Sequence, residues 1–315
     1  MAASTVLKTS KLSILESPTR QSVTSTETAQ LTRCQVKWRQ GKLVVELAND
    51  RAGESLPALH NLDWFKHCLA RSRATAVYID PNLDAQTLKL WADASEAAHL
   101  PVFLRLPARN ELPQNPCTLP WQLKCLLDRV AAAVLLFAFT PLMLIIISLM
   151  QLTMPGPIIF SQWRVGERGR LFRVFKFRSM VVDAEKHHNR VMGQQTGLHK
   201  LQNDPRVTPL GYWMRKLSLD ELPQLVNVVR GEMSLVGPRP WALYDAVRIK
   251  PELRHRLNAL PGITGAWQVE ARSTQLDLDA VNQRDVEYLK DWSLKEDLRI
   301  LLMTVPKVIA GSGAC

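Results

Sequence analysis

The chain has few cysteines and lacks the common nucleotide and zinc signatures. Its 315 residues include five cysteines, an odd number spread from Cys34 to Cys315 without paired spacing. This pattern provides neither a disulfide framework nor a structural zinc site, and it is typical of a reduced, cytosolic setting. A Walker loop and a G-x-G-x-x-G run are also missing, which argues against ATPase and nicotinamide-dependent activities.

Charged residues are missing from one long segment. Positions 130–163 contain 34 residues without Asp, Glu, Lys, Arg or His, and the apolar part, Val130–Leu152, has 23 residues. As a straight helix that part would be about 34 Å long. Because the hydrocarbon core of a bilayer is about 30 Å thick, burial in a membrane is the leading interpretation. The alternative is a buried core helix, although such helices rarely stay apolar on every face.

The apolar segment has a proline near its centre and basic residues on both sides. Pro141 is the twelfth of the 23 residues and removes a backbone hydrogen bond, which predicts a break or kink. Lys124 and Arg129 precede the segment, and six basic residues follow it between Arg164 and Arg178. Positive charge marks the cytoplasmic side of a membrane segment. Two basic flanks therefore favour a re-entrant hairpin over a helix that spans the membrane.

Composition divides the chain into four parts. Thirteen of the first 32 residues are Ser or Thr, which predicts a disordered arm over 1–33. Residues 34–106 alternate strand and helix patterns, as expected of a small α/β domain with a vaguely STAS-like arrangement. Four prolines mark 107–120 as a linker, and 121–315 forms the membrane-associated domain. The expected strands lie at 36–39, 42–47, 75–79 and 102–106, and the expected helices around 59–69 and 88–98.

Positive charge is concentrated in the second part of the chain. The net charge is +11, with 14 basic and 11 acidic residues up to position 120 against 26 and 18 beyond it. Such an excess suits a phosphate, a nucleic acid or an anionic membrane surface. The run Arg164–Met180 alternates basic and apolar residues, which predicts a strand with one charged face. That face would contact anionic lipid, line a phosphate site, or do both.

An adjacent acidic pair, Asp220 and Glu221, is the main candidate for chemistry. Ser218 and Glu221 have the spacing of a helix capping box, an interpretation that requires no catalysis. The same position at a helix start would favour ionised carboxylates and bound anions. One carboxylate could then attack phosphorus, and its neighbour could help to hold Mg²⁺ together with diphosphate oxygens and water.

Four motifs in order resemble the bacterial sugar transferase family, the monotopic polyprenyl-phosphate phosphoglycosyl transferases. They are KFRSM at 176–180, DELPQ at 220–224, GEMSLVGPRP at 231–240, and PGITG at 261–265 followed by WQV at 267–269. The resemblance covers about 60% of the chain and implies a membrane-embedded, mainly α, mixed α/β domain with a re-entrant helix. Thr140-Pro141 corresponds to the Ser-Pro-like pair at which that helix breaks in the family. Ala271 departs from the family, which commonly has Gly there.

The resemblance also implies a reaction. Asp220 would attack the phosphorus next to the sugar of a nucleotide diphosphate sugar, usually a UDP-sugar, and release UMP. Polyprenyl phosphate would then take the phosphosugar, as the first membrane step of exopolysaccharide or a related glycan. Glu221 matches the family's metal-associated acid, with Mg²⁺ as cofactor. The residues expected to bind phosphate or nucleotide are Lys176, Arg178, Arg215 and Arg239.

The implied setting is the inner leaflet of the bacterial cytoplasmic membrane, with the catalytic domain on its cytoplasmic face. Nucleic acid is not expected as a partner, because the uncharged run disfavours it. The sequence leaves open whether the protein forms a homo-oligomer. The alternative function is a catalytically silent membrane scaffold or regulator of polysaccharide export. The intact Asp220-Glu221 pair and Arg239 argue against that alternative. His187, His188 and His199 are read as solvated loop, since no partner with ligand spacing accompanies them.

Overall fold

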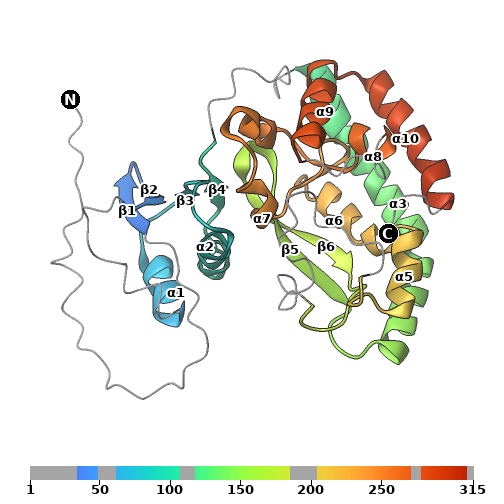
Figure 1. Cartoon of the computed structure of the whole chain (residues 1–315), viewed down its shortest axis with the longest axis horizontal. Helices are drawn as coiled ribbons and strands as arrows, with labels where there is room; N and C mark the ends of the chain where they lie inside the picture. Colours follow the sequence, from blue (N-terminus) through green and yellow to red (C-terminus); the bar gives the residue numbers. More distant parts are fainter. Residues whose placement is uncertain (1–33, 49–61, 107–117, 185–203, 271–277, 311–315) are drawn as a thin grey trace. The chain divides into compact units, whose positions relative to one another are not determined.

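The computed structural model describes residues 34–48, 62–106, 118–184, 204–270 and 278–310. The chain forms two compact units, Met1–Arg105 and Leu106–Cys315. The predicted arm and most of the predicted linker lie outside the described residues, so the four-part division stays a prediction. Each unit is a mixture of helices and strands (Figure 1), and the mixed α/β class is thus confirmed.

The first unit is a four-stranded sheet with two helices. Its elements are β1 (Cys34–Arg39), β2 (Lys42–Leu47), α1 (Leu62–Arg71), β3 (Ala76–Ile79), α2 (Ala85–Ala97) and β4 (Val102–Leu104). The strand order is β1-β2-β3-β4, with β1 antiparallel to β2 and the other pairs parallel. Gln40 and Gly41 both have positive φ, 48° and 77°, as a two-residue hairpin turn requires. The STAS-like comparison stays an expectation.

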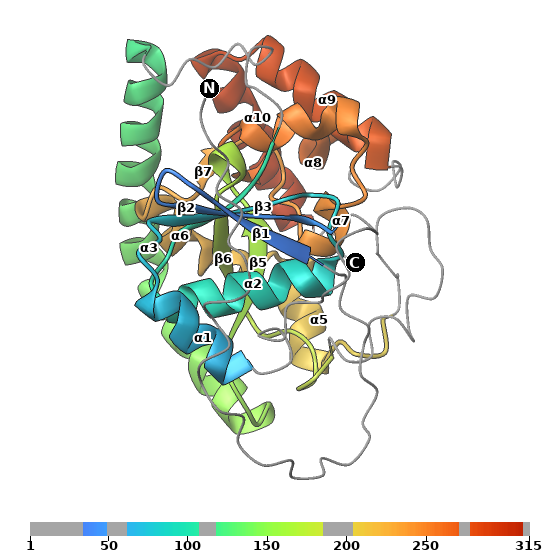
Figure 2. The same cartoon turned by 90° about the vertical axis from the view of Figure 1, so that its left-hand side faces the viewer.

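The second unit begins with the long helix α3 (Leu119–Thr153), which contains the apolar segment. The predicted break at Pro141 does not interrupt the helix, which continues through the proline. Figure 2 shows the helix changing direction near its middle, as expected where a proline removes one backbone hydrogen bond. Thr140 Oγ1 donates to the Leu136 carbonyl oxygen at 2.8 Å in the same turn.

One face of α3 packs on the second unit, and the rest of it is exposed. Ala132 belongs to one apolar cluster with Val228, and Ile146 and Met150 belong to another with Met214. Among the described residues, α3 is the one helix long and apolar enough to cross a membrane, and only 11% of its most apolar window is buried. The exposed face is therefore the part available to lipid.

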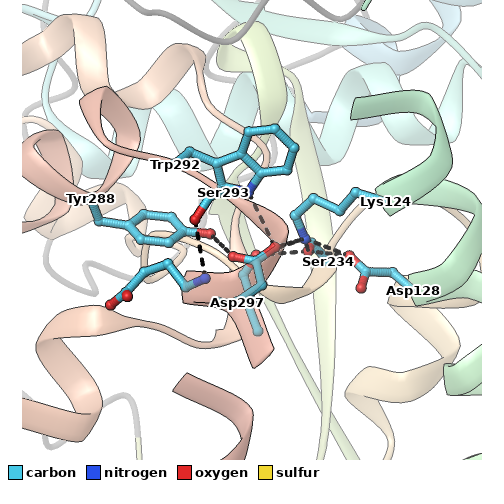
Figure 3. Close-up of polar contacts among 9 residues, drawn as sticks. Lys124, Asp128, Ser234, Tyr288, Trp292, Ser293 and Asp297 are labelled. Atoms are coloured by element: carbon cyan, nitrogen blue, oxygen red, sulfur yellow. Dashed lines mark hydrogen bonds and ion pairs between the residues drawn. The ribbon is translucent and has the colours of Figure 1, made fainter. Parts of the chain in front are cut away.

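A buried lysine holds the first turns of α3 (Figure 3). The Lys124 side chain is 2% exposed, and its Nζ donates to Asp128 Oδ2 at 2.7 Å and to Ser234 Oγ at 2.6 Å. Asp297 lies 3.1 Å from the same ammonium and accepts a hydrogen bond of 2.5 Å from Tyr288 Oη. A buried charge is tolerated when it is paired and fully hydrogen-bonded, as here. The network ties α3 to β7 (Ser234–Val236), α9 (Leu278–Lys290) and α10 (Leu294–Ile309).

A buried arginine holds the other end of α3. Arg178 Nε donates to the Pro157 carbonyl at 2.6 Å, and Nη2 donates to the carbonyls of Met154 and Pro155 at 2.7 and 3.0 Å. Nη1 reaches the Met180 carbonyl at 3.2 Å. These backbone contacts fix the chain that leaves the helix.

A hairpin follows where a single strand was expected. The basic run forms the end of β5 (Ile159–Val165) and the whole of β6 (Leu171–Phe177), which pair antiparallel. The 3₁₀ turn η3 (Glu167–Gly169) joins them, with Arg168 at φ 55° and Gly169 at φ 74°. The expectation of one continuous strand was wrong, because the positive-φ residues at this turn reverse the chain.

The remaining elements surround this hairpin. They are α5 (Pro209–Lys216), η4 (Leu219–Glu221), α6 (Gln224–Val229), β7, α7 (Leu243–Ala246), η5 (Pro251–Asn258), β8 (Gly262–Thr264), α8 (Ala266–Glu270), α9 and α10. Strands β7 and β8 pair parallel. Helix α3 runs along the unit from the α10 end to the α5 end (Figures 1 and 2), in agreement with its contacts to Asp297 and Met214.

Candidate active site

The acidic pair lies on a short 3₁₀ turn rather than at the start of a long helix. Helix α5 ends at Lys216, and Ser218 then takes a left-handed conformation with φ 53°. The Ser218 side chain makes no capping hydrogen bond, so the capping-box interpretation was wrong. Asp220 and Glu221 follow in η4, and α6 begins only at Gln224 with six residues. A helix dipole therefore contributes little to the charge of this pair.

Burial and nearby charges set the chemistry of Asp220. Its carboxylate is buried, with the residue 7% exposed, and this loss of hydration raises its pKa above the ordinary value. The Lys176 and Arg215 cations act in the opposite direction, and the Glu221 carboxylate raises the pKa further. Loss of hydration makes an ionised carboxylate a stronger nucleophile, and the two cations favour its ionised form.

Lys176 and Glu221, which both act on Asp220, form an ion pair and line a pocket, whereas Asp220 itself is not among the lining residues. Lys176 Nζ donates to Glu221 Oε1 at 2.5 Å, and the two side chains are 20% and 16% exposed. Lys176 comes from β6, so the hairpin places its cation against η4. The sequence predicted both residues for the site, and the structure brings them together.

A pocket opens beside the pair, and its charged lining is mainly cationic. Arg164, Lys176 and Arg239 contribute three positive charges, and Glu221 is the one carboxylate among the residues that line it. An excess of cations over carboxylates favours a bound anion. The remaining lining residues are Val174, Gln224, Pro240, Gly262, Ile263 and Gln268.

Two backbone hydrogen bonds and a close backbone contact hold the loop that carries Arg239. Gly237 N donates to the Thr264 carbonyl and Gly262 N to the Pro238 carbonyl, each at 2.9 Å. A Cβ atom on Gly262 would collide with the Gly237 backbone, so the two strands can approach only without a side chain there. The Arg239 guanidinium lies 6.0 Å from the centre of the Trp267 ring.

A buried ion pair also holds this loop, through a hydrogen bond to the Arg239 carbonyl. Arg256 Nη2 donates to the Arg239 carbonyl at 2.7 Å, and the guanidinium of Arg256 pairs with Asp285, which is 1% exposed. Since the backbone of Arg239 is held in place, its side chain loses little freedom when it binds an anion.

The two other predicted cations have different positions. Arg215 lies on the last turn of α5, where Nε donates to Ser179 Oγ at 2.8 Å, and its charge acts on Asp220. It adjoins the site without lining the pocket. Arg178 is used in the fold, since its hydrogen bonds go to four backbone carbonyls and it does not line the pocket. Arg178 was predicted to contact phosphate, and in the structure it holds the backbone instead.

Sequence reasoning missed three pocket residues, Arg164, Gln224 and Gln268. Arg164 was recognised only as part of a basic run, and nothing in that run distinguished it from the other basic residues. Gln224 and Gln268 fall inside the DELPQ and WQV motifs, so the motifs marked them without indicating their role. Ala271, His187, His188 and His199 lie outside the described residues.

The donor set suits a metal ion that arrives with a substrate. Within the described residues, no cluster of three or more His, Cys, Asp or Glu side chains could hold a metal by itself. Glu221, with Asp220 beside it, offers one or two carboxylates at the pocket. Mg²⁺ is commonly bound by such a number of carboxylates together with substrate phosphates and water. The residues present fit Mg²⁺ in that form.

Comparison with known proteins agrees with the motifs. The family model described as bacterial sugar transferase matches residues 119–311, more than half of the chain and all of the pocket. Galactosyl transferase CpsE of Streptococcus agalactiae is 48% identical over 162 residues, which are 50% of this chain and 36% of that protein.

Two further relatives match more of their own length. Exopolysaccharide production protein ExoY of Rhizobium meliloti is 38% identical over 199 residues, covering 59% of this chain and 85% of that protein. The UDP-glucose:undecaprenyl-phosphate glucose-1-phosphate transferase of Caulobacter vibrioides is 42% identical, covering 61% and 71%. The chain thus spans about a third of the length of CpsE and most of ExoY. On these matches, the chain belongs to the bacterial sugar transferase family.

Proposed function

We propose that this protein transfers a sugar 1-phosphate from a nucleoside diphosphate sugar of the UDP type to polyprenyl phosphate, in exopolysaccharide or related glycan synthesis. The observation that carries the proposal is the buried Asp220 carboxylate, which interacts electrostatically with Lys176 and Glu221, two of the residues that line a pocket with two further arginines. The relatives' names support it, since one denotes a glucose-1-phosphate transferase that acts on undecaprenyl phosphate.

In the proposed first step, an Asp220 oxygen attacks the phosphorus that carries the sugar. The bond from that phosphorus to the oxygen bridging the two phosphates breaks, and UMP leaves with the bridging oxygen. Asp220 then carries the phosphosugar as an acyl phosphate. Since one anhydride replaces another, the step runs close to thermoneutrality. Lys176 and Arg239 would bind the diphosphate oxygens, and Arg215 would stabilise charge beside Asp220.

In the proposed second step, an oxygen of polyprenyl phosphate attacks the same phosphorus. The bond to Asp220 breaks, the carboxylate is regenerated, and polyprenyl diphosphate sugar forms. Glu221, with Asp220 adjacent, is the residue that would hold Mg²⁺, which when bound neutralises diphosphate charge and orients its oxygens. Lys176 would then move its hydrogen bond from Glu221 to a phosphate oxygen.

The proposed location is the cytoplasmic face of the bacterial cytoplasmic membrane, with α3 dipping into one leaflet. Lys124 near its start and the Met154 carbonyl after its end are both bound by residues of the same polar unit. A spanning helix would place these two ends on opposite sides of about 30 Å of hydrocarbon. One polar unit cannot hold both ends in that arrangement. The change of direction at Pro141 allows the exposed face to enter lipid and return.

The topology has its own test. Single cysteines near Lys124 and near Arg168, in a background without native cysteines, should both react from the cytoplasmic side in intact cells. A Pro141→Leu background should straighten the helix and let some molecules span. In the protein that keeps Pro141, labelling of the two positions from opposite sides of the membrane would contradict the re-entrant arrangement.

The reaction is tested by identifying the released nucleotide. The purified full chain in lipid nanodiscs is given a panel of UDP-sugars with undecaprenyl phosphate and Mg²⁺. We expect UMP release and a lipid-linked diphosphate sugar from at least one donor, and neither from Asp220→Asn. Release of UDP would indicate ordinary glycosyl transfer and contradict the proposal. A wild-type protein without nucleotide release from any donor would favour the silent scaffold.

A further inference from the structure

Arg164 lines the pocket, but the function proposed above gives it no role. It lies near the end of β5, where its backbone pairs with Phe172 in the hairpin and bridges to Ala242. Two of its nitrogens are engaged, with Nη1 donating to the Pro240 carbonyl at 3.1 Å and Nη2 to Gln162 Oε1 at 2.7 Å. Its Nε atom is buried and has no hydrogen-bond partner in the structure.

Arg164 forms no ion pair among the described residues. Its hydrogen bonds go to a carbonyl and an amide, both neutral, and no carboxylate lies within 4.0 Å of it there. Burial lowers the pKa of its guanidinium, as does the neighbouring Arg239 cation, whereas Tyr244 and the Asp245 and Glu221 carboxylates act in the opposite direction. An arginine stays protonated in proteins. The side chain is therefore a half-buried cation that no carboxylate contacts directly.

The three fully buried arginines of the described residues use all their contacts inside the fold. Arg256 pairs with Asp285, Arg206 pairs with Asp204 at 2.6 Å, and Arg178 is surrounded by four backbone carbonyls. Arg164 differs from them because it lines a pocket and its buried Nε has no hydrogen-bond partner, so a bound anion would complete its contacts. Arg164 opens onto the same pocket as Lys176 and Arg239, so an anion that enters the pocket can reach all three cations.

We propose that Arg164 binds a phosphate oxygen of the substrate, as a third pocket cation beside Lys176 and Arg239. The proposal rests on the proposed function for the identity of the ligand and deepens it by one binding residue. The contacts to Pro240 and Gln162 orient the guanidinium in advance, which leaves the Nε–H and one N–H on each Nη for the phosphate. Such charge-assisted hydrogen bonds are stronger than neutral ones and suit the arginine fork. The phosphate belongs either to the nucleotide or to the polyprenyl lipid, and the experiment separates these sources.

The test compares Arg164→Met and Arg164→Lys with a matched control, Arg170→Met, in the full chain in nanodiscs. Arg170 lies on the exposed turn after η3 and outside the pocket. Three quantities are measured: the Kd of UDP by calorimetry, UMP release without lipid, and turnover with undecaprenyl phosphate. For a nucleotide phosphate, Arg164→Met weakens UDP binding about ten- to hundredfold and slows UMP release. Arg164→Lys recovers part of both, and Arg170→Met matches the wild type.

For a lipid phosphate, Arg164→Met keeps normal UDP binding and UMP release but slows turnover with undecaprenyl phosphate. Wild-type values for all three quantities would overturn the proposal. Since Arg164 pairs with no described carboxylate, Arg164→Met should unfold within a few degrees of the wild type. A variant that fails to fold would show a structural role and would also overturn the proposal. A wild-type protein that releases no UMP refutes the proposed function alone, because the UDP-binding comparison remains readable.

Discussion

Replacing Lys124 by methionine removes the cation at the centre of the network in Figure 3 and leaves its carboxylates in place. Asp128 and Asp297 are 13% and 9% exposed, and Lys124 itself is 2% exposed. Removing one partner of a buried ion pair costs about 3–5 kcal/mol, because the remaining charge is uncompensated. For a unit of about 200 residues each kcal/mol lowers Tm by about 2–4 °C, so the expected loss is about 6–20 °C.

The assay is calorimetric unfolding of the full chain in nanodiscs. Lys295→Met is the control, since Lys295 is exposed on α10 and its loss should change stability by less than about 0.5 kcal/mol. Asp297 keeps its hydrogen bonds from Tyr288 and Trp292, so adding Asp128→Asn to Lys124→Met should restore part of the loss. A Tm for Lys124→Met within 2 °C of the control would refute the reasoning that this lysine fixes α3.

Two further predictions concern the loops around the site. Gly262→Ala should push β8 from the Gly237 backbone, cost about 1–3 kcal/mol in unfolding free energy and reduce UMP release; wild-type activity would contradict this. Arg206 lowers the pKa of Asp204, so their pair contributes stability above the ordinary Asp pKa and loses it as pH falls through the lowered value. The unfolding free energy of Asp204→Asn should therefore be about 1–3 kcal/mol below that of the wild type at pH 7. This difference should narrow below about pH 4. Denaturant titrations in which the difference does not change with pH would refute the prediction.

Local structure in the first unit was largely predictable from the sequence. The strand at 42–47 matches β2, and those expected at 36–39, 75–79 and 102–106 differ from β1, β3 and β4 by two residues or fewer at each end. The signals there were short apolar runs bounded by turn residues, such as Gln40-Gly41. The helix expected around 59–69 corresponds to α1 (Leu62–Arg71), and residues 59–61 lie outside the described residues.

The second unit shows where such signals fail. The basic run was predicted as one strand, although its residues 166–170 include two glycines and no apolar residue, and the chain reverses there with Arg168 and Gly169 at positive φ. Ser218 had capping-box spacing, but a left-handed φ takes its side chain out of that role. Arg178 had the charge of a phosphate ligand, and only the fold shows that backbone carbonyls surround it.

The pocket itself required the tertiary structure. Its residues range from Arg164 to Gln268, about a hundred positions apart, and no spacing rule relates them. The motifs identified the acidic pair, Lys176 and Arg239, because these fall in contiguous runs. They did not identify Arg164, whose significance lies in its place at the pocket and in a buried Nε without a hydrogen-bond partner.

The central claim is that Asp220 becomes covalently bonded to the phosphosugar. The most direct measurement gives the protein its UDP-sugar with Mg²⁺ but without polyprenyl phosphate, and follows both UMP and the mass of the peptide that contains Asp220. The account predicts close to one equivalent of UMP per active site and a phosphosugar adduct on Asp220, both absent in Asp220→Asn. No UMP before the lipid is added, or an adduct that persists in Asp220→Asn, would contradict it.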